Sequence, residues 1–153
     1  GLDLSQLAGE ILAYPGVEVR RVSTLSDFQI WMDIANPALH GWDLLTLPRY
    51  AKWLDWGPYA FYLVFVDGAP ASTAAALRDG AGASVEFVAT MPPYRHRGAA
   101  TCACLYALRD ARAAGARVAT LRSEAGVHKM YERMGFAIHY EQRLFMHQAA
   151  DAE

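Results

Sequence analysis

The chain has 153 residues, of which 54% are hydrophobic, so it is long enough to form one domain around a substantial core. Its 14 Lys and Arg residues and 16 Asp and Glu residues give a formal charge of -2, which excludes a general basic field that could hold nucleic acid or an anionic membrane. No apolar run reaches the roughly 18 residues of a membrane span, and the N-terminus lacks the basic and apolar blocks of a signal peptide. We therefore predict a cytoplasmic protein without nucleic-acid or membrane partners.

Apolar spacing and turn residues divide the chain into strands and helices. Valines alternate along residues 17–24 as in a strand, and a helix follows with Ser26 or Asp27 as its cap and Pro37 as its stop. In chain order, the same patterns predict a short helix over 2–12, a strand over 17–24, helices over 26–35 and 47–57, three antiparallel strands over 59–67, 71–79 and 84–91, a helix over 98–114, a strand over 117–123, a helix over 127–135 and a strand over 136–145.

This order of elements predicts an α/β (α+β) fold with a mixed, mostly antiparallel central sheet of about six to seven strands and helices on both faces. We predict residues 1–16 to be an N-terminal extension, 17–147 to be the domain and 148–153 to be a frayed tail. Because the sequence starts at Gly1 instead of Met, a further upstream region of the natural protein could precede the extension.

The segment "PPYRHRGAA", residues 92–100, lies between a predicted strand and a predicted long helix. The first N–H groups of a helix have no intrahelical partner and attract anions, and a glycine there leaves room for a phosphate beside the backbone. The arginines add full positive charges, while the prolines restrict the backbone. The chain has neither of the familiar GxxxxGK and GxGxxG phosphate loops. We therefore predict a diphosphate site at Arg95, His96, Arg97, Gly98, Ala99 and Ala100.

The stretch "RHRGAA" resembles the RxxGxG or RxxGxA signature with which the GNAT family of N-acetyltransferases holds the pyrophosphate of acetyl-CoA. Its context, "VEFVATMPPYRHRGAA", and the later "MYERMGF" also match the family, so the resemblance extends over residues 17–145. His96 and Ala100 stand where many members have glycine. The resemblance implies the GNAT fold, acetyl-CoA as co-substrate and no metal. It also implies that the strand before the loop is splayed from its neighbour and exposes backbone groups of Val88 and Thr90 to the pantetheine and the thioester carbonyl, with Ser123 as a further contact to CoA.

The resemblance implies that Tyr131 protonates the departing CoA thiolate, and we favour this role because the match is positional within "YERMGF"; the alternative is a core tyrosine on a helix with apolar spacing. Glu86, on an otherwise apolar strand, is our candidate for the base that takes the amine proton; the alternative is a charged residue on the solvent face. His128 and His139 are rival bases. A cysteine acyl-enzyme is not expected, because no base is placed beside the two cysteines, which lie two residues apart in a predicted helix and so face different ways.

The acceptor pocket is predicted between the first two helices of the domain and the loop that joins them. Aromatic residues concentrate in this part of the sequence, at Trp31, Trp42, Trp53, Trp56, Tyr59 and Tyr62. Such a wall would suit an apolar or aromatic amine, although large aromatic side chains also dominate interior packing. Our candidates for the pocket are Trp31, Trp42 and Tyr59.

The sequence thus predicts a transferase that moves an acetyl group from acetyl-CoA to a primary amine of a small molecule or peptide, by direct attack in a ternary complex. A homodimer is a possible assembly. The alternatives are a CoA-binding sensor or interaction domain without catalysis, and a transferase that uses a longer acyl-CoA.

Overall fold

The structure is a computed structural model that describes residues 1–7, 14–40, 44–124 and 126–143. Its strands form one sheet of six, in the order β1-β6-β5-β4-β3-β2. The strands are β1 Leu2–Asp3, β2 Val17–Arg21, β3 Tyr59–Val66, β4 Ala69–Asp79, β5 Gly82–Thr90 and β6 Val118–Thr120. The helices are α1 Leu25–Ala35, α2 Leu47–Tyr50, α3 Ala99–Ala113 and α4 His128–Arg133.

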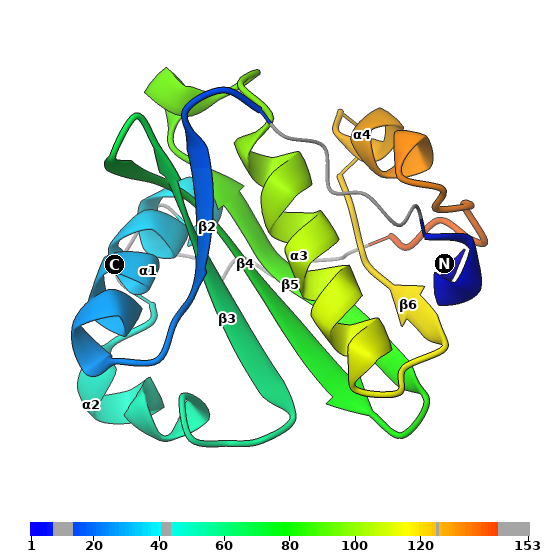
Figure 1. The fold of residues 1–153 in the computed structure, drawn as a ribbon, viewed down its shortest axis with the longest axis horizontal. Helices are drawn as coiled ribbons and strands as arrows, with labels where there is room; N and C mark the ends of the chain where they lie inside the picture. Colours follow the sequence, from blue (N-terminus) through cyan, green and yellow to red (C-terminus); the bar gives the residue numbers. More distant parts are fainter. Residues whose placement is uncertain (8–13, 41–43, 125, 144–153) are drawn as a thin grey trace, which may run out of the picture.

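Neighbouring strands are antiparallel except β5 and β6, which are parallel because α3 crosses between them. Helix α3 covers one face of the sheet and α1 covers the other (Figure 1). The alternation along β3 explains the two layers: Phe61 and Leu63 pack with α1, whereas Tyr62 and Val64 pack on the side of α3. The predicted mixed sheet with helices on both faces is confirmed. No helix in the described ranges is long and apolar enough to cross a bilayer.

Where we predicted a helix over residues 2–12, Leu2–Asp3 form a strand and Leu4–Gln6 form a short 3-10 turn. Leu2 lies opposite Ala119 of β6, and the N–H of Leu4 donates to the carbonyl of Arg117. The side chains of Leu2, Leu4 and Leu7 are buried between the sheet, α3 and α4. Helical apolar spacing was a weak guide here, because pairing with the edge of β6 buries the same leucines. Residues 8–12 of the predicted helix lie outside the described residues.

The C-terminal strand that we predicted over 136–145 is absent from residues 136–143; the last two positions lie outside the described ranges. Only Ala137 forms a strand-like pair there: it accepts from the amino group of Gly1 at 2.7 Å and donates to the carbonyl of Gly1 at 2.8 Å. The side chains of Ile138 and Tyr140 are exposed, so the alternating pattern of this segment buries little apolar surface. The N-terminal residues therefore occupy the position between β6 and this segment.

Two helix ends differ from our predictions. The cap of α1 is Thr24, whose Oγ1 accepts from the N–H of Asp27 at 3.1 Å. Pro37 does not end the helical backbone, which continues as a π-helical turn over Asn36–His40. The buried side chain of Asn36 bonds both backbone groups of Leu45, at 2.8 Å each, and so fixes the far side of the loop.

The predicted helix over 47–57 is shorter than expected. α2 ends at Tyr50 and passes into a 3-10 turn over Ala51–Trp53, after which the chain bends toward β3. Pro48 lies in the first turn of α2, as expected. Trp53, the last residue of the 3-10 turn, stacks on Tyr59 of β3.

Candidate active site

The sheet opens between β5 and β6. These strands pair only from Gly82 to Ser84, opposite Val118 to Thr120, and β5 then continues to Thr90 without β6 beside it. Helix α4 lies beyond this opening, next to the N-terminal half of α3 (Figure 1). The strand before the loop is therefore splayed from its parallel neighbour, as the resemblance implied.

A bulge in β5 lies at the opening. Thr73 and Ala75 of β4 pair with Ala89 and Glu86, so β5 has one residue more than β4 in this interval. Phe87 takes a left-handed φ of 52°, which is costly for a bulky side chain and persists only where the surroundings hold it. Here a buried hydroxyl does so, because Thr73 Oγ1 donates to the carbonyl of Phe87 at 2.9 Å.

The hydrogen bonds of the bulge determine which backbone groups face the opening. Ser72 Oγ donates to the carbonyl of Ala89 at 2.6 Å, so residues 87 and 89 both direct their carbonyls toward β4. Successive residues of a strand present their backbone groups to opposite edges. The backbone groups of Val88 and Thr90 therefore face away from β4, toward the opening.

We expect Thr73→Val to weaken this arrangement. The variant keeps the shape of a fully buried side chain but leaves the Phe87 carbonyl without its donor, which should cost about 1–3 kcal/mol of unfolding free energy. It should also raise KM for acetyl-CoA severalfold, as measured by steady-state kinetics beside chemical denaturation. Thr120→Val, on the exposed surface of β6, is the control and should change neither value. An unchanged KM in a folded Thr73→Val protein would disprove the role of the bulge.

The loop after β5 brings its backbone to the start of α3 through two left-handed residues. A 3-10 turn over Pro92–Tyr94 is followed by His96 at a φ of 61° and Gly98 at 81°. His96 is exposed, and its positive φ explains why glycine is common at this position in the family that the sequence resembles. Gly98 precedes Ala99, the first residue of α3, and offers no side-chain cap to the first turn. The leading N–H groups of the helix are therefore without a side-chain cap from their own N-cap residue, which suits an anion.

Gly98 is needed for a second reason, which the sequence did not indicate. A Cβ on Gly98 would overlap the ring of Tyr14, which lies against this glycine just before β2. The residue thus accommodates both a left-handed backbone and an aromatic neighbour from a distant part of the chain. No sequence signal pairs Tyr14 with the loop, because 84 residues separate them.

The two arginines of the loop are exposed and have protein partners. Arg95 Nε donates to the carbonyl of Thr90 at 3.2 Å, which folds its side chain back toward the end of β5. Arg97 Nη2 contacts Asp67 Oδ2 at 2.6 Å, with 42% and 62% of the two side chains exposed. Exposed ion pairs contribute little to stability, so a bound diphosphate can compete for Arg97.

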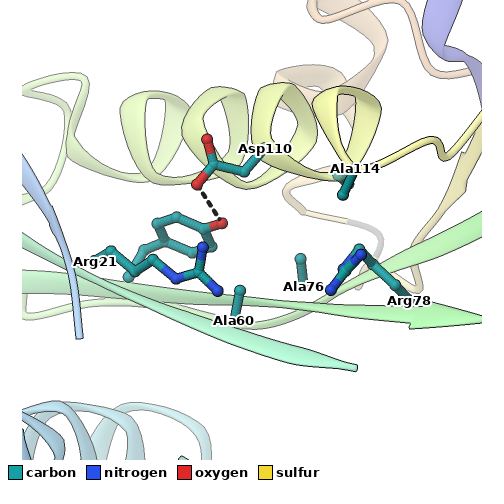
Figure 2. A pocket seen from close by; sticks show the side chains of 8 residues that line it. Arg21, Ala60, Ala76, Arg78, Asp110 and Ala114 are labelled. Atoms are coloured by element: carbon teal, nitrogen blue, oxygen red, sulfur yellow. Dashed lines mark hydrogen bonds between the residues drawn. The ribbon is translucent and has the colours of Figure 1, made fainter. Parts of the chain in front are cut away.

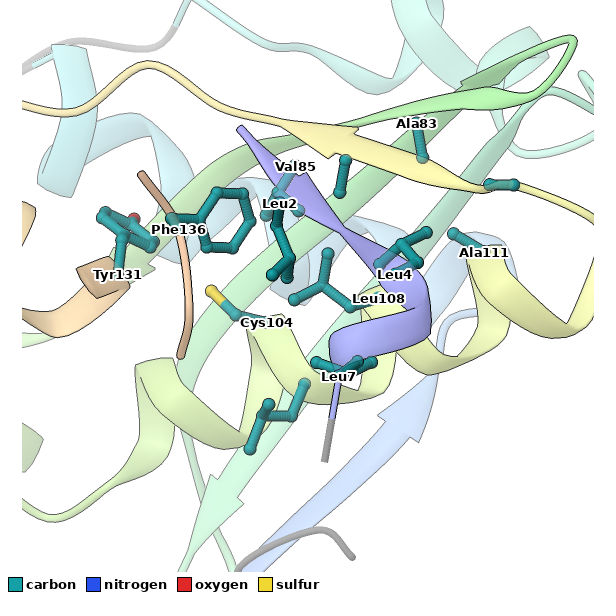
Figure 3. Close-up of a cluster of buried hydrophobic side chains, with 13 residues drawn as sticks. Leu2, Leu4, Leu7, Ala83, Val85, Cys104, Leu108, Ala111, Tyr131 and Phe136 are labelled. Atoms are coloured by element: carbon teal, nitrogen blue, oxygen red, sulfur yellow. The ribbon is translucent and has the colours of Figure 1, made fainter. Parts of the chain in front are cut away.

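Tyr131 of α4 lies in the apolar cluster between α3, α4 and β1 (Figure 3). Its ring packs edge-on against Phe136 at 6.1 Å between centroids, as a core tyrosine would. Val85 belongs to the same cluster, and Val88 packs against it. Tyr131 therefore lies on the same face of the sheet as these two valines, which belong to the opened part of β5. Burial, and to a smaller extent Cys104, holds the pKa of Tyr131 well above its usual range, so the phenol keeps its proton at neutral pH.

The cysteines of α3 are buried, and neither takes part in a disulfide. Burial, with a smaller effect of Cys102, raises the pKa of the Cys104 thiol to about 12. Cys104 is therefore a thiol at neutral pH.

Glu86 lies on the face of the sheet that α1 covers. It pairs with Ala75, which packs in the same cluster as Phe61, and it accepts a hydrogen bond from Ser84. Because the bulge follows it, Glu86 and Phe87 both lie on this face. The Glu86 side chain is partly buried. Burial of Tyr59 raises the pKa of its phenol, and the nearby negative charge of Glu86 raises it further.

The aromatic residues named from the sequence divide between the two faces. Trp31 is fully buried against Phe61 and Phe87, and its indole N–H donates to the carbonyl of Ala74 at 3.1 Å, so it belongs to the core. Tyr59 is only partly buried and lies beside Trp53 and Trp56. Trp42 lies outside the described residues.

Tyr62 faces α3 instead of the predicted pocket. Its hydroxyl donates to Asp110 Oδ2 at 2.9 Å, beside a small cavity of about 50 Å³ that Arg21 and Arg78 also line (Figure 2). This cavity extends to Ala114 at the C-terminal end of α3, far from the loop at its start. It is therefore separate from the opening between β5 and β6.

Ser123 follows β6 and is exposed, with its Oγ donating to the carbonyl of the adjacent Glu124 at 2.9 Å. Nothing in this local hydrogen bond tests the predicted contact between Ser123 and CoA, which stays a prediction.

Sequence reasoning did not single out the hydroxyls of Ser72 and Thr73, which hold the bulge. The available signal was a pair of consecutive polar residues within the otherwise apolar stretch 69–77 of the strand.

Solved structures share this architecture. An acetyltransferase from Trypanosoma brucei is 19% identical, with a TM-score of 0.71 over 85% of this chain and 99% of the other. Glucosamine-6-phosphate N-acetyltransferase from Arabidopsis thaliana is 14% identical, with a TM-score of 0.69 over 86% and 99%. An aminoglycoside N-acetyltransferase in complex with CoA is 18% identical, with a TM-score of 0.70 over 88% and 95%. Among curated proteins no match was found. The fold is thus that of the N-acetyltransferases.

The family follows from the sequence itself. The model of the acetyltransferase (GNAT) family matches residues 28–136, which is most of the chain and includes β5, the loop, α3 and α4. The chain therefore belongs to the GNAT family of acetyltransferases, enzymes that take their acetyl group from acetyl-CoA.

Proposed function

We propose that this enzyme transfers the acetyl group of acetyl-CoA to a primary amine of a small molecule, by direct attack while both substrates are bound. The observation that carries the proposal is the opening between β5 and β6, together with the N-terminus of α3, whose N-cap residue Gly98 has no capping side chain. The diphosphate would lie on the first N–H groups of α3, at Gly98, Ala99 and Ala100, with Arg95 and Arg97 beside it and His96 in the same turn.

The remaining residues supply the chemistry. The backbone groups of Val88 and Thr90 would hold the pantetheine and polarise the thioester carbonyl. Glu86 would take a proton from the amine, whose nitrogen then attacks the carbonyl carbon. The carbon–sulfur bond breaks, and Tyr131 gives its proton to the departing thiolate. The products are an amide and CoA, and the proton on Glu86 returns to Tyr131 through solvent. Ser123 is retained as a proposed contact with CoA.

A thermal-shift experiment tests the co-substrate. Acetyl-CoA at a hundred times its Kd should stabilise the protein by about 2.7 kcal/mol, and free CoA should also stabilise it because the loop contacts only the CoA part. Arg95→Ala should reduce the shift, whereas Arg109→Ala, on the exposed side of α3, should leave it unchanged. A larger shift with longer acyl-CoAs would favour another donor. No shift with any of them would disprove the proposal, and binding without acetylation of any amine would favour a CoA sensor.

A further inference from the structure

An open cavity of about 520 Å³ lies on the chain segment that joins α2 to β3, and its volume is in the range of small-molecule sites. It is lined by Lys52, Trp53, Asp55 and Trp56, from the 3-10 turn and the bend that follows it. The indole of Trp56 is 50% exposed, although large aromatic side chains usually have most of their surface covered. The cavity therefore presents aromatic surface that the rest of the protein does not cover.

Trp53 connects this cavity with the proposed reaction centre. Its ring stacks on Tyr59, with centroids 5.2 Å apart and planes inclined by 17°, and lies 6.2 Å from the ring of Phe87 in the bulge. Phe87 is the residue after Glu86, and both lie on the face of the sheet that α1 covers. We call Trp53, Tyr59 and Phe87 the aromatic row; it ends beside Glu86, the proposed base. A molecule that rests on Trp53 is thus at the outer end of this row.

The lining chemistry favours an aromatic ligand over an amino sugar. Two indoles provide flat apolar surface, and the charged lining residues are one lysine and one aspartate, so their charges cancel. A polycationic amino sugar would find no excess of carboxylates here, and its hydroxyls would lose water against the indoles without gaining partners. An aryl group would stack on the indoles, which is the arrangement that Trp53 and Tyr59 already show.

We infer that the acceptor is an arylalkylamine, with its ring on Trp53 and Trp56 and its amino group directed along the aromatic row to Glu86. The inference rests on the proposed function and names its substrate class. The amine nitrogen loses one proton to Glu86 and forms a bond to the acetyl carbon, and CoA leaves as the thiol. Trp53 and Trp56 act as specificity residues, because they contact the part of the acceptor that does not react.

The test compares amines at saturating acetyl-CoA, with thiol release as the readout. Phenethylamine and tryptamine should have kcat/KM at least about tenfold above those of an aminoglycoside and of glucosamine 6-phosphate, a difference of about 1.4 kcal/mol. Trp56→Leu, at a half-exposed position that can lose its ring without opening the core, should raise KM for the arylalkylamines with little change in kcat. Trp53→Leu should do the same more strongly. Tyr140→Leu, at a 76% exposed position outside the cavity, is the matched control.

Faster acetylation of the amino sugars would overturn the inference and leave the proposed function standing. A binding experiment distinguishes the opposite case, in which the proposed function fails and the inference stands. Saturation-transfer NMR should detect phenethylamine on the wild-type protein and no longer detect it on Trp56→Leu, whether or not any amine is acetylated. Binding without acetylation would support the aromatic site while the proposed function fails. If no arylalkylamine binds or reacts, the inference is wrong.

Discussion

Tyr131→Phe is expected to lower kcat by about a hundredfold to ten-thousandfold while the Kd of acetyl-CoA stays nearly unchanged. The substitution removes the phenolic proton but keeps the ring that packs against Phe136. Tyr131 is protonated at neutral pH, as a proton donor must be, and burial, which raises its pKa, makes it a weaker acid than an exposed tyrosine. Thiol release should measure kcat, and calorimetric titration should measure the Kd.

Tyr62→Phe is the control for this prediction. Tyr62 is also buried, burial holds its pKa above the usual range, and its hydroxyl donates to Asp110 on the α3 side of the sheet. The control should lose about 1 kcal/mol of unfolding free energy and keep kcat. If Tyr131→Phe retained full turnover, Tyr131 would be a core tyrosine, and the thiolate would take its proton from water.

Gly98→Ala is expected to abolish measurable acetyl-CoA binding and to destabilise the fold. A left-handed backbone costs a residue with a Cβ about 1–2 kcal/mol, and the new methyl group would also overlap the ring of Tyr14. Relief of that overlap would move the loop or Tyr14, so the N–H groups at the start of α3 would no longer be held in place. Chemical denaturation and calorimetric titration would measure the two effects.

Gly115→Ala separates the two causes. Gly115 follows α3 with a φ of 100°, and a Cβ there would meet no atom within 4 Å. This control should show the backbone cost alone, with normal acetyl-CoA affinity. In the double variant Tyr14→Ala, Gly98→Ala, the part of the destabilisation that exceeds the control should be recovered. Equal losses in the two single glycine variants would contradict the role of Tyr14.

The sequence predicted those parts of the fold whose signals are local. The strands of the central hairpins, the start of α2 next to Pro48 and the end of α3 shortly before Gly115 follow from residues within a few positions of each boundary. The predicted helix over 2–12 is reduced in the described residues to the 3-10 turn Leu4–Gln6, and the strand predicted over 136–145 is absent from residues 136–143. Leu2 and Ala137 obtain their partners from Ala119 and Gly1, at the other end of the chain.

The candidate site divides in the same way. The loop from Arg95 to Ala100 was predictable, because its charges, glycine and following helix are consecutive in the chain. The acceptor side was not, because a tryptophan in a sequence does not show which of its faces is covered. Trp31, on the inner face of α1, is fully buried, whereas Trp53 and Trp56 line a cavity.

The sequence by itself determined the family, the position of the glycine- and arginine-containing loop before α3 and the alternation of strands and helices, because these depend on short stretches whose chemistry and periodicity are complete within themselves. Only the tertiary structure decided the bulge at Phe87, the contact of Tyr14 with Gly98 and the strand that Leu2 adds to the sheet. Each of these joins residues far apart in the chain, and their energies come from burial and hydrogen bonds that form only when the sheet has assembled.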